Sequence, residues 1–217
     1  SGQLLWIHCR GIMKWNDDMT RPLFFSGSMV CLKNEDAVDS TTGLLNLSSA
    51  EEELSAICST SRSPLLLLSF VFQPLADINL AFGRETGDAV LREIGSQLEI
   101  QMGTFFRFFR LSDNHFLAFS HKDMVPALPI RQIRNIMLDV CAKHGIHMMY
   151  PCAAGVLHYP KDGSTAQELI DNAIVAANVS ANFPSLDYLE FSSHMTQNQR
   201  EQSSLGFALN YSVNHAF

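Results

Sequence analysis

The sequence predicts an α+β domain in which a central five-stranded sheet is flanked by helices and preceded by an N-terminal β-hairpin. Strand-like and helix-like segments follow one another in the order β-α-α-β-β-α-β-α-β, which is typical of a sheet covered by helices. The run 65–72, LLLLSFVF, has almost no polar side chain and predicts a central strand buried on both faces. Of the 217 residues, 47% are apolar and 17% charged, which suffices for a sizeable core and excludes a disordered chain.

The first 33 residues contain two strand-like runs on either side of a polar turn. Asn16, Asp17 and Asp18 separate the runs, and this arrangement predicts a β-hairpin. An isolated hairpin is only marginally stable in water. We therefore expect residues 3–33 to pack on the rest of the chain or on a second copy of it.

The remaining elements are predicted from helix-capping residues, from prolines and glycines that end elements, and from the spacing of hydrophobic residues. The first helix opens on serine caps followed by carboxylates, and Pro74 ends the buried strand that follows this helix. Gly83 and Gly87 are expected to break the second helical region into two pieces. The predicted helices span 48–60, 75–102, 130–143 and 165–182, and the predicted strands span 65–72, 104–111, 116–120, 148–159 and 188–191.

Composition excludes several functional classes. The formal net charge is −7, the pI is about 5.5, and there is no basic stripe, so nucleic-acid binding is not expected. No apolar run approaches the ~20 residues that a membrane span needs. The 5 cysteines are scattered and odd in number, which favours reduced thiols in a cytoplasmic protein.

Two local patterns have ligand-binding residue types but favour a structural explanation. Cys141, His144 and His147 resemble metal ligands, yet they lack a fourth partner at a typical spacing, so we interpret them as a core cysteine and two surface histidines. The glycine-rich segment 83–88 begins a helix and could bind phosphate there. A turn between two helices is the favoured alternative.

Three short motifs occur in a fixed order along the chain. They are DSTTGLLN at 39–46, INLAFGRETGDAVL at 78–91 and AAGVLHYPKDG at 153–163. In this order they resemble the D-x-L-T-G-L-x-N-R, I-N-D-x-x-G-H-x-x-G-D-x-x-L and S-I-G-V-A…Y-P-x-D-G motifs of the GGDEF family, the diguanylate cyclase domains of bacterial cyclic di-GMP signalling. The resemblance implies the nucleotidyl-cyclase fold of that family.

The signature hairpin of the family, G-G-D/E-E-F, is altered in this chain. Its five positions hold Ser112, Asp113, Asn114, His115 and Phe116. In the family, the acidic third position and an aspartate at the end of the first main strand help to hold divalent metal; the corresponding residues here are Asn114 and Val71. Because Mg²⁺ prefers carboxylate and phosphate oxygens, the resemblance implies that the Mg²⁺ site of active relatives is lost. No catalytic residue and no cofactor are therefore expected.

The phosphate-binding positions also depart from the family pattern. The two lysines expected there are Ala76 and Ala181, and the R-x-x-D product-inhibition motif falls on 103–106 without either charged residue. Asn79 and Asp88 remain, and in relatives these positions hydrogen-bond guanine. Local capping of a turn and a helix N-terminus is the favoured explanation of both residues. GTP binding is expected to be weak or absent.

The ends of the chain resemble the neighbours that GGDEF domains have in longer proteins. RPLFFSG at 21–27 resembles the end of a PAS domain, and residues 205–217 are similar to the helix that opens an EAL phosphodiesterase domain. The resulting division assigns 1–35 to the end of a PAS module, 36–195 to a degenerate GGDEF domain and 196–217 to a linker helix toward an EAL domain.

Three functions are compatible with these residues. The favoured one is a catalytically inactive regulatory module that relays signals or mediates homodimerisation between PAS and EAL domains. The second is a GTP-binding allosteric sensor that uses Asn79 and Asp88. The third is a residual cyclase that condenses 2 GTP to cyclic di-GMP, a reaction that needs carboxylate-bound metal.

Overall fold

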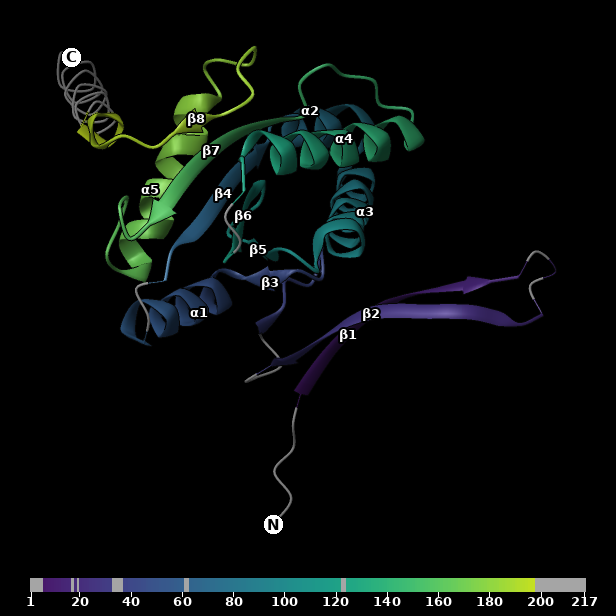
Figure 1. The fold of residues 1–217 in the computed structure, drawn as a ribbon. Coiled ribbons are helices and arrows are strands. Elements are labelled where there is room, and N and C mark those ends of the chain that lie inside the picture. The colour runs from purple at the N-terminus through teal and green to yellow at the C-terminus, as the bar shows by residue number, and fades with distance from the viewer. Residues whose placement is uncertain are drawn as a thin grey trace, which may run out of the picture.

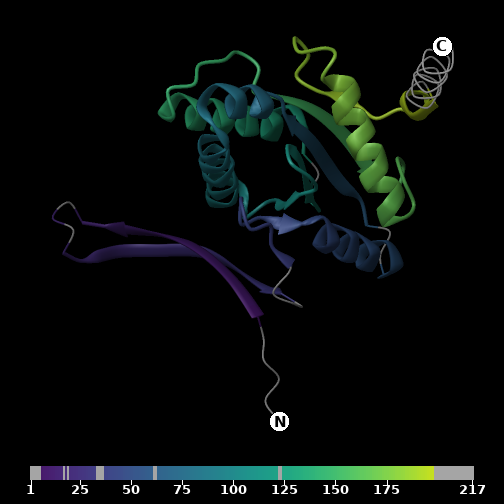
Figure 2. The same cartoon turned by 180° about the vertical axis from the view of Figure 1, so that it is seen from behind.

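The computed structural model describes residues 6–16, 18, 20–32, 37–60, 63–121 and 124–197. Within these residues the chain forms a 6-stranded sheet with helices on both faces and a separate 2-stranded hairpin (Figures 1 and 2). The main sheet contains β3 (Leu45–Asn46), β4 (Leu65–Phe72), β5 (Arg107–Arg110), β6 (His115–Ser120), β7 (Cys152–Tyr159) and β8 (Leu189–Glu190). The helices are α1 (Leu47–Thr60), α2 (Leu75–Phe82), α3 (Arg84–Met102), α4 (Ala127–Lys143) and α5 (Ala166–Ser180).

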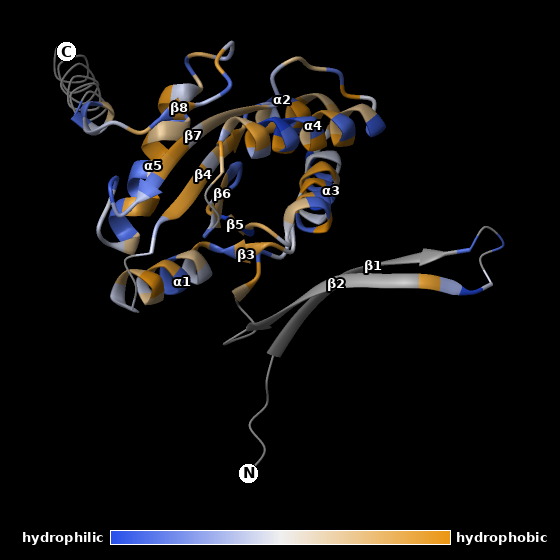
Figure 3. Ribbon diagram, in the orientation of Figure 1, coloured by the Kyte–Doolittle hydropathy of each residue, from blue (hydrophilic) through white to orange (hydrophobic). Residues whose placement is uncertain are grey.

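Strand β4 lies at the centre of the sheet, as the sequence predicted. The strand order is β3-β5-β6-β4-β7-β8, and β4 pairs antiparallel with both β6 and β7. Its eight residues are all buried. Leu66, Leu68 and Phe70 join a core with α3 and α4, whereas Leu65 and Leu67 join a core with α1 and α5. Figure 3 shows the apolar character of β4 and β7, which agrees with strands covered on both faces.

The sheet has one strand more than predicted. Strands β3 and β8 are only two residues long and occupy the two edges. No strand was predicted at Leu45 and Asn46, but these two residues pair parallel with β5. Short edge strands carry little periodic signal, so their pairing depends on the neighbouring strand rather than on their own residues.

The helical region 75–102 forms two helices, as predicted, but the break between them lies at Gly83 alone. Gly83 has a φ of +84° and separates α2 from α3, which is a conformation that favours glycine. The predicted break at Gly87 is wrong, because Gly87 lies within α3. Its role is steric: a Cβ at Gly87 would stand 1.9 Å from Oδ1 of Asn79, so glycine allows α2 to pack closely against α3.

The predicted N-terminal hairpin is present as β1 (Trp6–Trp15) and β2 (Pro22–Leu32), which pair antiparallel. Figure 1 shows this ribbon projecting away from the main sheet, and β1 approaches α3. Large apolar residues of this hairpin, Trp6, Phe24 and Phe25, are the reason to expect it to pack on another surface, but their side chains lie outside the described residues.

Two further expectations also fall outside the description. The boundary predicted between residues 35 and 36 lies in a segment that the structure does not describe, and so does the linker helix predicted at 196–217, apart from its first two residues. Among the helices that it does describe, none is both long and apolar enough to cross a membrane.

Candidate functional site

A cavity of about 390 Å³ lies where β4 ends, between α2, the start of α3 and the turn that joins β5 to β6. It brings together residues from three separate parts of the sequence. Its lining consists of Leu75, Ala76, Asn79, Arg84, Asp88, Leu91, Arg110, Asp113 and Asn114. Five of the positions singled out by the GGDEF resemblance therefore lie around one cavity, namely Ala76, Asn79, Asp88, Asp113 and Asn114.

The signature segment forms a tight turn between two strands, as expected. The backbone N–H of Leu111 donates to the carbonyl of His115 at 2.9 Å, which closes the turn. Phe116 is fully buried and stacks on Phe70 of β4, with ring centroids 5.3 Å apart. Because His115 pairs with Val71, the turn is held in register beside the end of β4.

The two positions that the resemblance assigned to metal ligands do lie together. Asn114 Nδ2 donates to the carbonyl oxygen of Phe72 at 3.2 Å, and the backbone N–H of Phe72 donates to the carbonyl of Asn114 at 2.8 Å. Val71, the adjacent residue, is 6% exposed. An amide and a valine side chain offer no anionic oxygen, so their chemistry does not suit a divalent magnesium ion.

Asn79 and Asp88 both face the cavity. Neither side chain makes a capping hydrogen bond among the described residues, and α3 begins without any side-chain cap. Oδ1 of Asn79 is buried and has no hydrogen-bond partner in that part of the chain. The capping explanation favoured from the sequence is therefore wrong, and the unsatisfied oxygen of Asn79 lies against Gly87 at the contact between α2 and α3.

The charges around the cavity balance. Arg84 and Arg110 contribute two positive groups, and Asp88 and Asp113 contribute two negative ones. Ala76 lies in the lining, where the family has a lysine, while Ala181 is the C-cap of α5. The site therefore has no net positive field that would attract a triphosphate.

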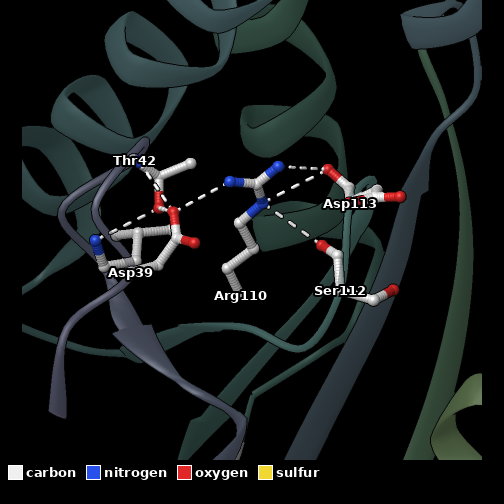
Figure 4. Close-up of polar contacts among 6 residues, drawn as sticks. Asp39, Thr42, Arg110, Ser112 and Asp113 are labelled. Atoms are coloured by element: carbon white, nitrogen blue, oxygen red, sulfur yellow. Dashed lines mark hydrogen bonds and ion pairs between the residues drawn. The ribbon is translucent and has the colours of Figure 1, made fainter. Parts of the chain in front are cut away.

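Arg110 links two distant segments and is not among the site residues predicted from the sequence. Figure 4 shows its guanidinium between Asp39 and the signature turn. Nη1 donates to Oδ1 of Asp39 at 2.9 Å, and Nη2 donates to the carbonyl of Asp113 at 2.7 Å. Nε donates to the carbonyls of Ser112 and Asp113, each at 3.2 Å. The only sequence signal was an arginine two residues before the signature motif.

The Asp39 carboxylate is also held by a residue of its own segment, Thr42. Its Oδ1 accepts hydrogen bonds from the backbone N–H of Thr42 at 2.8 Å and from the Thr42 hydroxyl at 2.7 Å (Figure 4). Burial alone would raise the pKa of Asp39, but the Thr42 and Arg110 hydrogen bonds outweigh it and hold the pKa below its ordinary value of 3.8. Asp39 is thus an anion at neutral pH and a stable partner for Arg110.

A further contact connects the signature turn to α5. The Nε2 atom of His115 lies 3.0 Å from Oδ1 of Asn178, and its Nδ1 lies 3.4 Å from Oγ of Ser112. The fourth signature residue therefore holds the turn against a helix.

The second candidate cluster is structural, in agreement with its interpretation from sequence. Cys141 is fully buried in the core, and burial raises its thiol pKa to about 11. His144 Nε2 lies 3.1 Å from Oε2 of Glu93, which also accepts from Lys143 through Oε1. Among the described residues no three potential ligands converge on a metal-binding point.

Known structures have the same fold. A sensory box/GGDEF family protein from Caulobacter crescentus has a TM-score of 0.56 and 24% identity, over 67% of this chain and 98% of that one. The GGDEF domain of TpbB (YfiN) from Pseudomonas aeruginosa has a TM-score of 0.58 and 20% identity, over 76% and 99%. The GGDEF domain of DgcB from C. crescentus, solved in complex with c-di-GMP, has a TM-score of 0.55 and 14% identity, over 73% and 94%. No curated protein matches the chain.

The family profile described as "Diguanylate cyclase, GGDEF domain" matches residues 36–179. The match contains Asp39, the cavity and the signature turn, and it agrees with the mixed α/β architecture of the solved GGDEF domains. The chain therefore belongs to the GGDEF family, the domains of cyclic di-GMP signalling proteins.

Proposed function

We propose that this chain is a catalytically inactive GGDEF-type regulatory module in a bacterial cyclic di-GMP signalling protein. The observation that carries the proposal is the pair Val71 and Asn114 at the end of β4, where the amide of Asn114 is engaged with a backbone carbonyl. A cyclase must activate a 3′-hydroxyl and neutralise triphosphate charge, and divalent metal held by carboxylates does both. This chain offers no carboxylate at either position.

The Arg110 network supports a role in signal relay. It joins Asp39, close to the start of the family match, to the carbonyls of the signature turn. A displacement of the preceding segment would therefore change the hydrogen bonds of the turn directly. We propose that the module transmits such displacements, or mediates homodimerisation, between a PAS domain before it and an EAL domain after it.

The proposed context rests on the ends of the chain. Residues 1–35 carry the PAS-like hairpin, and 196–217 carry the EAL-like segment. The similar protein from C. crescentus is described as a sensory box/GGDEF family protein, which supports a sensory domain upstream. The odd number of cysteines favours a cytoplasmic location.

We expect the purified chain to form no cyclic di-GMP from GTP with Mg²⁺ or Mn²⁺. Without carboxylates at residues 71 and 114, no side chain at these positions holds the divalent metal that the reaction requires. Product is measured by chromatography and mass spectrometry, with an active GGDEF domain as a positive control. Turnover above the level of a heat-denatured sample would contradict the proposal.

A GTP-binding allosteric sensor is the second candidate, and one observation favours it. Asn79 and Asp88 face the cavity without capping bonds, and the Asn79 oxygen is unsatisfied among the described residues. A guanine base could supply the missing donors. A residual cyclase is the third candidate and would also need the metal site discussed above.

We expect any GTP binding to be weak, with a Kd above roughly 0.1 mM, which corresponds to about −5.5 kcal/mol. Two hydrogen-bonding side chains contribute about 2–5 kcal/mol together, and the balanced charge of the cavity adds little attraction for the triphosphate. Calorimetry with and without Mg²⁺ measures this affinity. Asp88→Ala should weaken it, whereas Asp77→Ala, an exposed residue of α2 outside the lining, should not. Micromolar affinity that depends on Mg²⁺ and on Asp88 would instead establish the sensor.

A further inference from the structure

Asn114 and Phe72 are joined in both directions. The backbone N–H of Phe72 donates to the carbonyl of Asn114 at 2.8 Å, and the Asn114 side chain returns a donor, Nδ2, to the carbonyl of Phe72 at 3.2 Å. The first bond continues the β4–β6 ladder past its last pair. The second bond depends only on the side chain of residue 114.

The identity of the Asn114 donor follows from its partner. A carbonyl oxygen can only accept a hydrogen bond, so the amide must direct its nitrogen toward Phe72 and its oxygen elsewhere. A carboxylate at residue 114 would place two acceptor oxygens about this far apart with no proton between them. Such a pair is repulsive unless a cation or a proton lies between the oxygens.

The side chain of Asn114 is accessible to ions in the cavity. Asn114 lines the 390 Å³ cavity and is only partly buried, whereas the carbonyl of Phe72 belongs to a fully buried residue outside the lining. The neighbouring Val71 adds no oxygen there. With an amide nitrogen already donating to this carbonyl, a cation would have to displace a hydrogen bond and accept a neutral ligand in return.

We infer that the side-chain amide of Asn114 takes the place of a divalent cation and holds the signature turn to the end of β4 without metal. We call the pair of hydrogen bonds between Asn114 and Phe72 the clasp, and it forms without metal. This inference goes beyond the regulatory proposal, because a domain could lack cyclase activity and still use a bound ion to order its turn.

The test compares thermal unfolding of the 217-residue chain and its variants in 10 mM MgCl₂, 10 mM MnCl₂ and NaCl of matched ionic strength. The wild-type Tm should not change with the cation. Asn114→Ala should lower the Tm by about 2–4 °C, which is the shift expected when one hydrogen bond is lost in a chain of this size. Asn114→Asp should lower it further in NaCl, because repulsion is added to the loss of the donor.

A variant designed to bind a cation serves as the positive control for cation-dependent stabilisation. Val71→Asp combined with Asn114→Asp places two carboxylates beside the Phe72 carbonyl. Its Tm should rise in MgCl₂ or MnCl₂ relative to NaCl, whereas the Tm of Asn114→Ala should not. If this double variant does not fold, the wild-type protein still decides the question by NMR: the Asn114 side-chain amide resonances should stay sharp when Mn²⁺ is added.

Two results would overturn the inference. One is a cation-dependent rise in the wild-type Tm, or broadening of the Asn114 amide resonances by Mn²⁺. The other is an Asn114→Asp variant that is no less stable than Asn114→Ala in NaCl. Neither result would restore cyclase activity, so failure of the clasp is distinguishable from failure of the regulatory proposal.

Discussion

Arg110→Ala is expected to destabilise the domain by about 2–4 kcal/mol. The Arg110 side chain is 10% exposed and its ion-pair partner Asp39 is 23% exposed, so the pair is shielded from water. Removal of the arginine leaves the Asp39 carboxylate without its cation and the carbonyls of residues 112 and 113 without their donor. Urea unfolding measures the loss. Arg131→Ala, an exposed arginine of α4, is the control and should change stability by less than about 0.5 kcal/mol.

The effect of Arg110→Ala should depend on pH in a defined direction. The folded-state pKa of Asp39 is below 3.8, its ordinary value, so its stabilising contribution is complete above about pH 4 and is lost as the pH falls through the lowered pKa. The gap in unfolding free energy between wild type and Arg110→Ala should therefore be widest near pH 7 and narrow near pH 3. An equal gap at both values would show that the ion pair does not cause the effect.

Gly155→Ala is expected to cost about 2–4 kcal/mol, because it inserts a methyl group between β7 and α5. The new Cβ would lie 2.5 Å from Cβ of Ala176 and 2.7 Å from the backbone nitrogen of Ala177. Backbone atoms cannot move without shifting the whole helix, and α5 carries Asn178, the partner of His115. The loss should appear in urea unfolding.

A double variant tests the mechanism of this loss. Ala176→Gly removes one of the contacting atoms, but it also costs about 1 kcal/mol as a glycine within a helix. When both substitutions are combined, the total loss should be smaller than the sum of the single losses, because part of the clash is relieved. Additive losses would contradict the close-packing explanation.

Much of the fold could be predicted from local sequence. The absence of a polar face at 65–72 is sufficient to place β4 inside the sheet, since no residue of this strand tolerates water. The turn before β6 and the cap at Thr165, which accepts from the Glu168 N–H, are likewise set within a few residues. The collinear motifs indicated the GGDEF family, which the profile match to residues 36–179 confirms.

The candidate site could be predicted only in part. The motifs singled out Asn79, Asp88 and the signature residues, and the cavity brings Asn79, Asp88, Asp113 and Asn114 together. The capping explanation of Asn79 failed because Asn79 packs across Gly87 from a neighbouring helix, a contact that neither residue reveals in sequence. The edge strand β3 was also decided by its neighbour β5, whereas β8 lies within the strand predicted at 188–191.

The sequence by itself determined which segments are buried, where the chain turns and which family it belongs to, because hydrophobic spacing and turn chemistry act over a few residues. Only the tertiary structure decided that Arg110 binds Asp39, 71 residues earlier, and that the Asn114 amide meets the carbonyl of Phe72, 42 residues earlier. These contacts form between segments that come together only when the sheet assembles. Their geometry depends on strand register and helix packing, which no local pattern records.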